Sequence, residues 1–318
     1  MSDPIEVRWC RATCFCELLA FMLIYSITWL LNILLVLLTV AFFTLFERKL
    51  IGLVHLRIGP NKIRFLGLCQ PLLDAFKLLT KQQLTSLRSN KLIYSASPQL
   101  SLFTSLLFWS LLPTYGLIFS NSYSILAFIF LGTIIVFSNL LAGWASNSKY
   151  TYIGRLRSVA QSVSYESVLT TLVILVIVIT STYSIGSFIF NTSFLMFTIF
   201  PLWFFSTLAE THRAPFDFSE RESELVSGYN TEYSGAYFAF VFLREYSSLI
   251  FSCGLIYYLF FSFRVSPLLF SVSVLALSFI FILVRVTYCR YRYDFLISLA
   301  WKSLLPISLC LLLFSYLV

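Results

Sequence analysis

Residues 209–246 read AETHRAPFDFSERESELVSGYNTEYSGAYFAFVFLREY, and long apolar segments flank them on both sides. The stretch holds seven of the fourteen carboxylates of the 318-residue chain. These are Glu210, Asp217, Glu220, Glu222, Glu224, Glu232 and Glu245. Carboxylates beside a membrane core are costly, so their concentration indicates a functional site. The simpler alternative is a solvated loop with a capped helix, for which Ser219 and Glu222 fit the pattern, but it does not explain Glu210 and Glu245, which abut or enter apolar segments.

Outside this stretch the chain is dominated by apolar residues. The composition is 59% apolar and 11% charged, whereas soluble domains carry roughly 25% charged residues. Because about 20 apolar residues cross a bilayer, the pattern predicts an all-α polytopic membrane protein with eight transmembrane helices. The expected segments are 18–46, 97–117, 122–143, 167–186, 188–208, 236–262, 265–284 and 297–318.

Residues 22–318 are expected to form a single transmembrane domain. Residues 1–21 carry mixed charge and three cysteines, a pattern that fits neither a span nor a targeting peptide. We therefore expect this N-terminal extension to be absent from the mature chain, with Met22 as the start.

The loops between these segments are strongly asymmetric in charge. Loops after the odd-numbered segments hold 17 lysines and arginines, whereas the loops on the other side hold only Arg264. Basic loops remain on the inner side of a membrane. The asymmetry therefore predicts that both termini lie on the outer side.

A short amphipathic helix is expected at 70–81, in the longest polar loop. It begins at Gln70-Pro71, and proline is favoured at the first helical position. Leu72, Phe76 and Leu79 share one face. This spacing suits a helix lying in the membrane interface, although an ordinary amphipathic helix packed on its neighbours has the same pattern.

Several classes of active site are absent from the sequence. There is no P-loop, no GxGxxG motif, no CxxC pair among seven cysteines, and only two histidines are present. The sequence therefore predicts no metal site, and no nucleotide, iron–sulfur or haem site on this chain.

The charged groups at the span ends can instead exchange protons. Burial and neighbouring like charge raise the pKa of a carboxylate, whereas arginine lowers it. We expect Glu166, Glu210 and Glu245 to act as relay groups leading from the inner surface into the membrane. Arg213 is available to Glu210, but Arg244 is a poor direct partner for Glu245 because adjacent residues on a helix point in different directions.

Five motifs resemble those of one family, chain 1 of NADH:ubiquinone oxidoreductase, the mitochondrially encoded quinone-site membrane subunit of respiratory complex I. They are ERKLIGLVHLRIGPNK at 47–62, QPLLDAFKLLTK at 70–81, GWASNSKYTYIGRLRSVAQSVSYE at 143–166, AETHRAPFDFSERESELVSGYNTEY at 209–233 and RYRYDFL at 290–296. Their order between the apolar segments makes the resemblance specific, and it covers about residues 22–318.

The resemblance implies an access tunnel for ubiquinone and the start of a charged relay that couples its reduction to proton translocation. Flavin and iron–sulfur clusters would lie on partner subunits in the mitochondrial inner membrane, and neighbouring peripheral-arm and membrane-arm subunits and lipid would be the contacts, with no nucleic acid. Tunnel residues carried over by motif are Arg48, Arg57, Asp74, Arg213, Tyr233, Phe242 and Arg285. Relay residues are Glu166, Glu210, Asp217, Glu220, Glu222, Glu224, Glu232 and Glu245.

Two residues depart from the family pattern, and two other functions remain open. His212 replaces the usual asparagine and can titrate near neutrality, while Arg221 replaces glycine and is expected to lower the pKa of neighbouring carboxylates.

A proton-coupled transporter would also use a carboxylate relay. The related membrane subunit of an energy-converting hydrogenase shares parts of the acidic loop.

Overall fold

The structure is a computed structural model that describes residues 4–63, 67–85, 89–113, 122–185, 193–217, 232–261 and 267–317. Helices account for the regular structure in these ranges, and no strand occurs within them. The helices are α1 (Pro4–Val54), α2 (Gln70–Thr80), α3 (Lys91–Trp109), α4 (Ser124–Ala145), α5 (Lys149–Thr180), α6 (Ser193–Glu210), α8 (Gly235–Phe260), α9 (Pro267–Thr287), α10 (Tyr293–Leu299), η4 (Ala300–Leu304) and α11 (Leu305–Leu317).

The helices confirm an all-α polytopic membrane protein. Each of the eight expected apolar segments overlaps a helix, because main-chain polar groups in hydrocarbon must be satisfied within the segment. Within the described ranges, six helical segments are long and apolar enough to cross a membrane. α3 and α6 are not among these six, so the number of eight spans remains a prediction.

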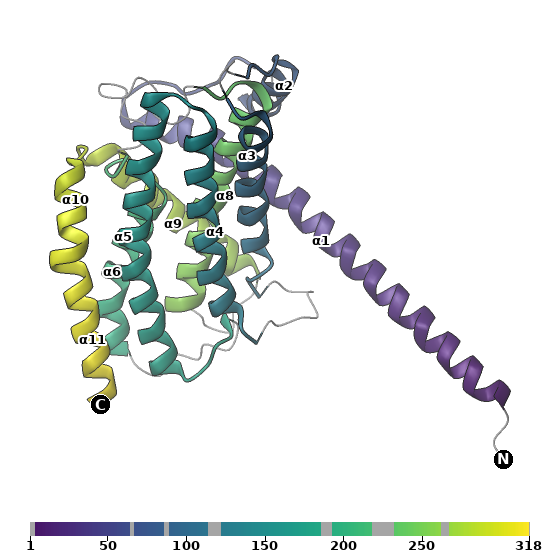
Figure 1. The fold of residues 1–318 in the computed structure, drawn as a ribbon. Coiled ribbons are helices and arrows are strands. Elements are labelled where there is room, and N and C mark those ends of the chain that lie inside the picture. The colour runs from purple at the N-terminus through teal and green to yellow at the C-terminus, as the bar shows by residue number, and fades with distance from the viewer. Residues whose placement is uncertain are drawn as a thin grey trace.

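The long helices pack side by side in one bundle, with α8 and α5 at its centre (Figure 1). The apolar window of α8 is 61% buried, compared with 22% for the windows of α1 and α9. α8 contacts α1, α2, α3, α6 and α9, while α5 contacts α4, α6, α10, η4 and α11. The central position of α5 and α8 brings polar side chains from both helices into the interior.

Helix α1 is longer than the sequence predicted. It begins at Pro4, so helix continues through most of the segment expected to be a separate extension. Its N-terminal part projects away from the bundle (Figure 1). Loss of residues 1–21 from the mature chain therefore remains a prediction.

Helix α2 lies at one end of the bundle and matches the expected amphipathic helix closely. Pro71 is in its first turn and is buried. Leu72, Phe76 and Leu79 are 52%, 70% and 61% exposed, so the apolar face is not packed on the rest of the chain. This exposure favours a helix lying in the membrane interface.

The last span changes helical type near its proline. Pro306 has no N–H group and cannot bond to the carbonyl four residues earlier. The wider π-turn η4 immediately precedes α11, and such turns adjust the hydrogen-bond ladder locally. The chain can therefore remain helical across this span.

Candidate functional site

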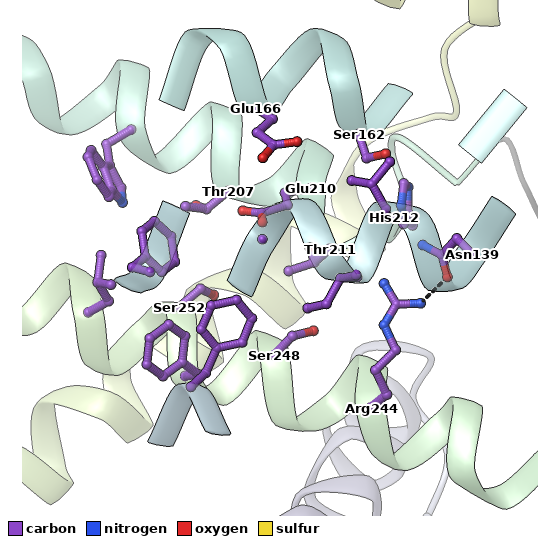
Figure 2. A pocket seen from close by; sticks show the side chains of 18 residues that line it. Asn139, Ser162, Glu166, Thr207, Glu210, Thr211, His212, Arg244, Ser248 and Ser252 are labelled. Carbon is purple, nitrogen blue, oxygen red and sulfur yellow. Dashed lines mark hydrogen bonds between the residues drawn. The ribbon is translucent and has the colours of Figure 1, made fainter. Parts of the chain in front are cut away.

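A polar cavity lies inside the bundle, between α4, α5, α6 and α8 (Figure 2). Its volume is about 50 Å³, which exceeds the roughly 10–15 Å³ that one water molecule needs. Ten of its lining residues carry polar side chains: Asn139, Ser162, Glu166, Thr207, Glu210, Thr211, His212, Arg244, Ser248 and Ser252. A polar cavity among apolar helices can hold water and move protons.

Two predicted relay carboxylates share this cavity. Glu166 comes from the middle of α5 and Glu210 is the last residue of α6. They interact electrostatically, and Glu166 Oε1 is buried with no hydrogen-bond partner. Since two ionised carboxylates that are buried in one cavity repel each other, the pair is suited to sharing and passing protons.

Arginine on the opposite wall balances this negative charge. Arg244 of α8 also lines the cavity and attracts Glu210 electrostatically. The sequence had assigned Arg213 to Glu210, and this prediction was wrong because Arg213 is bonded to Glu47. Adjacent helical residues face different directions, so Arg244 reaches Glu210 rather than Glu245.

His212 also lines the cavity, but it does not titrate near neutrality. Burial, together with the charges of Arg244 and Arg155, lowers its pKa to about 3. The expectation of a titrating His212 is therefore corrected: its imidazole is neutral at physiological pH. Its φ of 51° lies in the left-handed region, where asparagine and histidine are both enriched.

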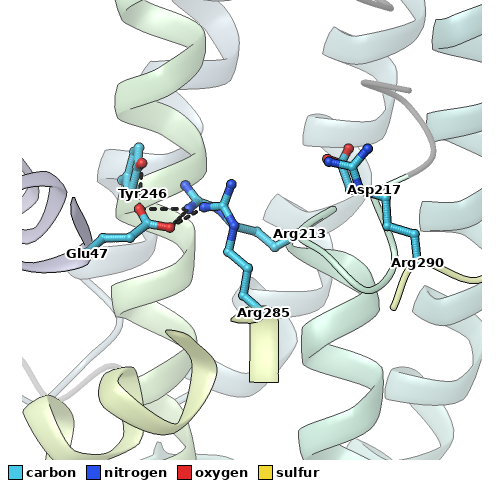
Figure 3. A network of polar contacts seen from close by, with 6 residues as sticks. All are labelled: Glu47, Arg213, Asp217, Tyr246, Arg285 and Arg290. Carbon is cyan, nitrogen blue, oxygen red and sulfur yellow. Dashed lines mark hydrogen bonds and ion pairs between the residues drawn. The ribbon is translucent and has the colours of Figure 1, made fainter. Parts of the chain in front are cut away.

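A second buried cluster centres on Glu47 of α1 (Figure 3). Arg213 Nη1 donates to Glu47 Oε1 and Oε2 at 3.0 and 3.1 Å, and Arg285 donates to Oε1. Tyr246 Oη donates to Oε2 at 2.7 Å, and the Arg213 guanidinium lies 4.0 Å from the centre of the Tyr246 ring. Two predicted tunnel residues, Arg213 and Arg285, are thus joined through one carboxylate.

The charge of Arg213 is maintained by this cluster. Burial opposes the protonated form of arginine, but attraction to Glu47, Tyr246 and Glu245 outweighs it and raises the pKa of Arg213 above its usual value. Arg213 therefore remains a cation inside the bundle. Glu245, a predicted relay group, lies within its electrostatic reach.

Other predicted residues lie in separate places. Asp217 is buried and faces Arg290 at 3.9 Å. The main-chain carbonyl of Glu232 accepts a hydrogen bond from Tyr94, and Tyr233 stacks on Tyr94 with ring centres 4.5 Å apart. Burial raises the pKa of Tyr233, so its hydroxyl stays protonated and hydrogen-bonded.

The remaining tunnel residues come from α1, α2, α8 and the loop after α1. Arg48 of α1 pairs with Asp74 of α2 at 2.7 Å, and Gln70 also donates to Asp74. Arg57 is exposed, while Phe242 is half-buried on α8 and its ring centre is 4.4 Å from that of Phe238.

Some predictions fall outside the described residues. Glu220, Glu222 and Glu224 are among these, as are Arg221 and the proposed cap at Ser219. Their roles remain predictions from the sequence.

Sequence reasoning missed three residues of the cavity and the Glu47 cluster: Asn139, Arg244 and Tyr246. Arg244 stands inside an apolar span, a signal that could have marked it as a site residue. Glu47 begins the first of the five motifs, but the sequence did not place it at the centre of a cluster. Its partners Arg213, Tyr246 and Arg285 are 166, 199 and 238 positions away in the chain, so only the packed helices reveal them.

A family model and individual relatives match the same family over about 90% of the chain. The family model described as NADH dehydrogenase matches residues 27–316. The chain is similar to NADH-ubiquinone oxidoreductase chain 1 of Aedes aegypti, with 45% identity over 90% of this chain and 93% of the relative. Identity is 46% with the corresponding chain of Anopheles gambiae, over 90% and 92%, and 43% with that of Locusta migratoria, over 91% and 94%.

Proposed function

Because the chain belongs to the NADH dehydrogenase family, as a chain 1 membrane subunit of NADH:ubiquinone oxidoreductase, we propose that it forms the ubiquinone access tunnel and the first part of the proton relay of that enzyme. The observation that carries the relay proposal is the enclosure of Glu166 and Glu210 in one cavity with a cationic wall. The chain acts only within the assembled enzyme.

In the relay, the cavity holds protons at the two carboxylates. An ionised carboxylate in an apolar interior costs several kcal/mol unless it is paired or protonated. Glu210 has Arg244 as its counter-charge, whereas Glu166 Oε1 has no hydrogen-bond partner among the described residues. A change of charge at one carboxylate alters the proton affinity of the other, so the pair can transmit an electrostatic signal.

The wider relay set is carried over from the sequence resemblance. We assign to it Asp217, Glu232 and Glu245, which are described here, and Glu220, Glu222 and Glu224, which are not. Glu245 interacts electrostatically with Arg213, a member of the Glu47 cluster. This cluster offers a connection between the tunnel residues and the relay.

In the tunnel, apolar and charged surfaces would serve different parts of ubiquinone. The exposed apolar face of α2 suits the hydrocarbon tail. The guanidinium groups of Arg48, Arg57, Arg213 and Arg285 can orient the quinone head group. The ubiquinone is a substrate. Electrons would arrive from flavin and iron–sulfur clusters on partner subunits.

The proposed location is the mitochondrial inner membrane, with the basic loops facing the matrix. The proposed partners are the peripheral-arm subunits of the quinone site, neighbouring membrane-arm subunits and lipid. The family assignment favours this function over a proton-coupled transporter, and identity over about 90% of the chain favours it over the hydrogenase subunit.

Asp74→Asn tests the tunnel. The Arg48–Asp74 pair is largely exposed, with 54% and 36% of the two side chains accessible, so folding should change by no more than about 1 kcal/mol. Loss of the charge should loosen α2 at the tunnel. We expect the apparent KM for ubiquinone to rise about twofold to fivefold, with NADH oxidation by an artificial acceptor unchanged.

The matched control is Asp294→Asn, which removes a carboxylate from the exposed pair with Arg292. This variant should leave the apparent KM unchanged. An equal loss of both activities in Asp74→Asn would indicate failed assembly, and an unchanged KM in an assembled enzyme would contradict the tunnel role of Asp74.

A further inference from the structure

Two buried arginines meet at a single asparagine on the relay cavity. Asn139 Oδ1 of α4 accepts hydrogen bonds from Arg155 Nη1 of α5 and Arg244 Nη1 of α8, each at 2.9 Å. Asn139, Arg155 and Arg244 are only 3%, 4% and 6% exposed. Only the amide oxygen can accept both bonds, since a side-chain NH₂ cannot accept. The amide orientation is therefore fixed.

The local backbone is shaped to admit this arrangement. Gly143, one turn beyond Asn139 on α4, faces Arg155, and a Cβ atom there would lie 2.5 Å from Arg155 Cβ. Such a distance is well below van der Waals contact. The absence of a side chain at Gly143 thus lets Arg155 pass between α4 and α5 into the interior.

The guanidinium group of Arg244 faces the cavity that contains Glu210. It lines the cavity with Glu210 (Figure 2), and its Nε is buried without a hydrogen-bond partner. Its electrostatic neighbours are Arg155, which repels it, and Glu210, which attracts it. Holding two positive charges together in an apolar interior is energetically unfavourable. The arrangement is therefore expected to serve a function that offsets this cost.

We propose that Asn139 holds Arg155 and Arg244 as a fixed positive wall that sets the pH at which the Glu166–Glu210 cavity takes up and releases protons. The inference rests on the proposed relay function and assigns Asn139 and Arg244 as its positioning residues. The charged or titratable groups that line the cavity are Glu166 of α5, Glu210 of α6, His212 of the following turn, and Arg244 of α8. Arg155 of α5 does not line the cavity, but it is bonded to Asn139, which does, and it acts electrostatically on Arg244 and His212. His212 is neutral, so the wall consists of the two guanidinium groups.

Asn139→Asp tests this role with a nearly isosteric change. The new carboxylate keeps both hydrogen bonds as ion pairs but cancels one positive charge of the wall. Protonation of the cavity then becomes easier, so the acid limb of the pH profile of ubiquinone reduction should move up by about one pH unit. The measurement uses the assembled enzyme and follows NADH-driven ubiquinone reduction across the neutral range.

Three further variants complete the design. Asn90→Asp makes the same chemical change at an exposed position and should leave the profile unchanged. Arg244→Met should shift the profile in the same direction as Asn139→Asp, whereas Arg244→Lys, which keeps the charge, should retain the original profile. If Asn139 served only to hold the helices together, its substitution would lower the amount of assembled enzyme without shifting the pH profile of ubiquinone reduction.

An assembled Asn139→Asp enzyme with the original profile would overturn the proposal. If that variant does not assemble, identical profiles for Arg244→Met and Arg244→Lys would overturn it instead. Glu210→Gln, made in parallel, distinguishes a failure of the proposed relay function from a failure of the positive wall. Normal coupled activity in Glu210→Gln would count against the relay itself, whereas an impaired Glu210→Gln with unshifted Asn139→Asp would count against the positive wall alone.

Discussion

Glu210→Gln is expected to lower coupled ubiquinone reduction at least tenfold, which corresponds to about 1.4 kcal/mol in activation free energy. Glutamine keeps the shape and the hydrogen bonding of the side chain but cannot ionise. The cavity would then lose the carboxylate that attracts Arg244 and couples to Glu166. NADH oxidation by an artificial acceptor should remain unchanged, because this reaction does not use the cavity.

The comparison variant is Asp294→Asn. It removes the negative charge of a side chain that is 74% exposed. Its coupled activity should equal that of the unmodified enzyme. If Glu210→Gln assembles normally and reduces ubiquinone at the normal rate, then Glu210 is not a relay group.

Glu47→Gln is expected to have the largest effect on stability. Glu47 is 3% exposed and is the shared partner of Arg213 and Arg285. Removing its charge leaves Arg213, whose side chain is only 11% exposed, as a buried cation without its closest counter-charge. Breaking a buried ion pair in this way costs about 3–5 kcal/mol. The enzyme should therefore assemble poorly, or inactivate at a clearly lower temperature.

Thermal inactivation of the purified assembly measures this effect. Asp294→Asn again provides the exposed counterpart, for which a change of at most about 1 kcal/mol is expected. An assembled Glu47→Gln enzyme with the same inactivation temperature as that control would show that the Glu47 cluster does not hold α1, α8 and α9 together.

The positions of the helices were largely predictable because the need to satisfy main-chain hydrogen bonds in lipid dominates their formation. Apolar segments must satisfy their own main-chain hydrogen bonds in lipid, so hydropathy located a helix at each of the eight expected segments. The start of α5 was wrong, because this helix begins at Lys149 rather than at 167, and Glu166 therefore lies in its middle rather than at a span end. The proline at position 71 and the spacing of Leu72, Phe76 and Leu79 located α2 to within one residue at its C-terminal end. The length of α1 was missed, because its N-terminal residues lack the apolar character on which the prediction relied.

The pairing of charges was much less predictable. Sequence proximity suggested Arg213 for Glu210, whereas packing directs Arg213 to Glu47 and Arg244 to Glu210. Neighbours in sequence lie about 100° apart around a helix, and partners on other helices are chosen by the tertiary fold. The charge state of His212 was mispredicted for the same reason, since its burial and the nearby arginines are properties of the folded bundle.

The central claim is that Glu166 and Glu210 act as one relay in one cavity. Its most direct test is a double-mutant cycle with Glu166→Gln, Glu210→Gln and the double variant, measured as proton translocation coupled to ubiquinone reduction in sealed membranes. If the two carboxylates serve one relay, the double variant should be within about twofold of the more impaired single variant. A loss in the double variant equal to the product of the two single losses, or normal proton translocation in either single variant, would contradict the account.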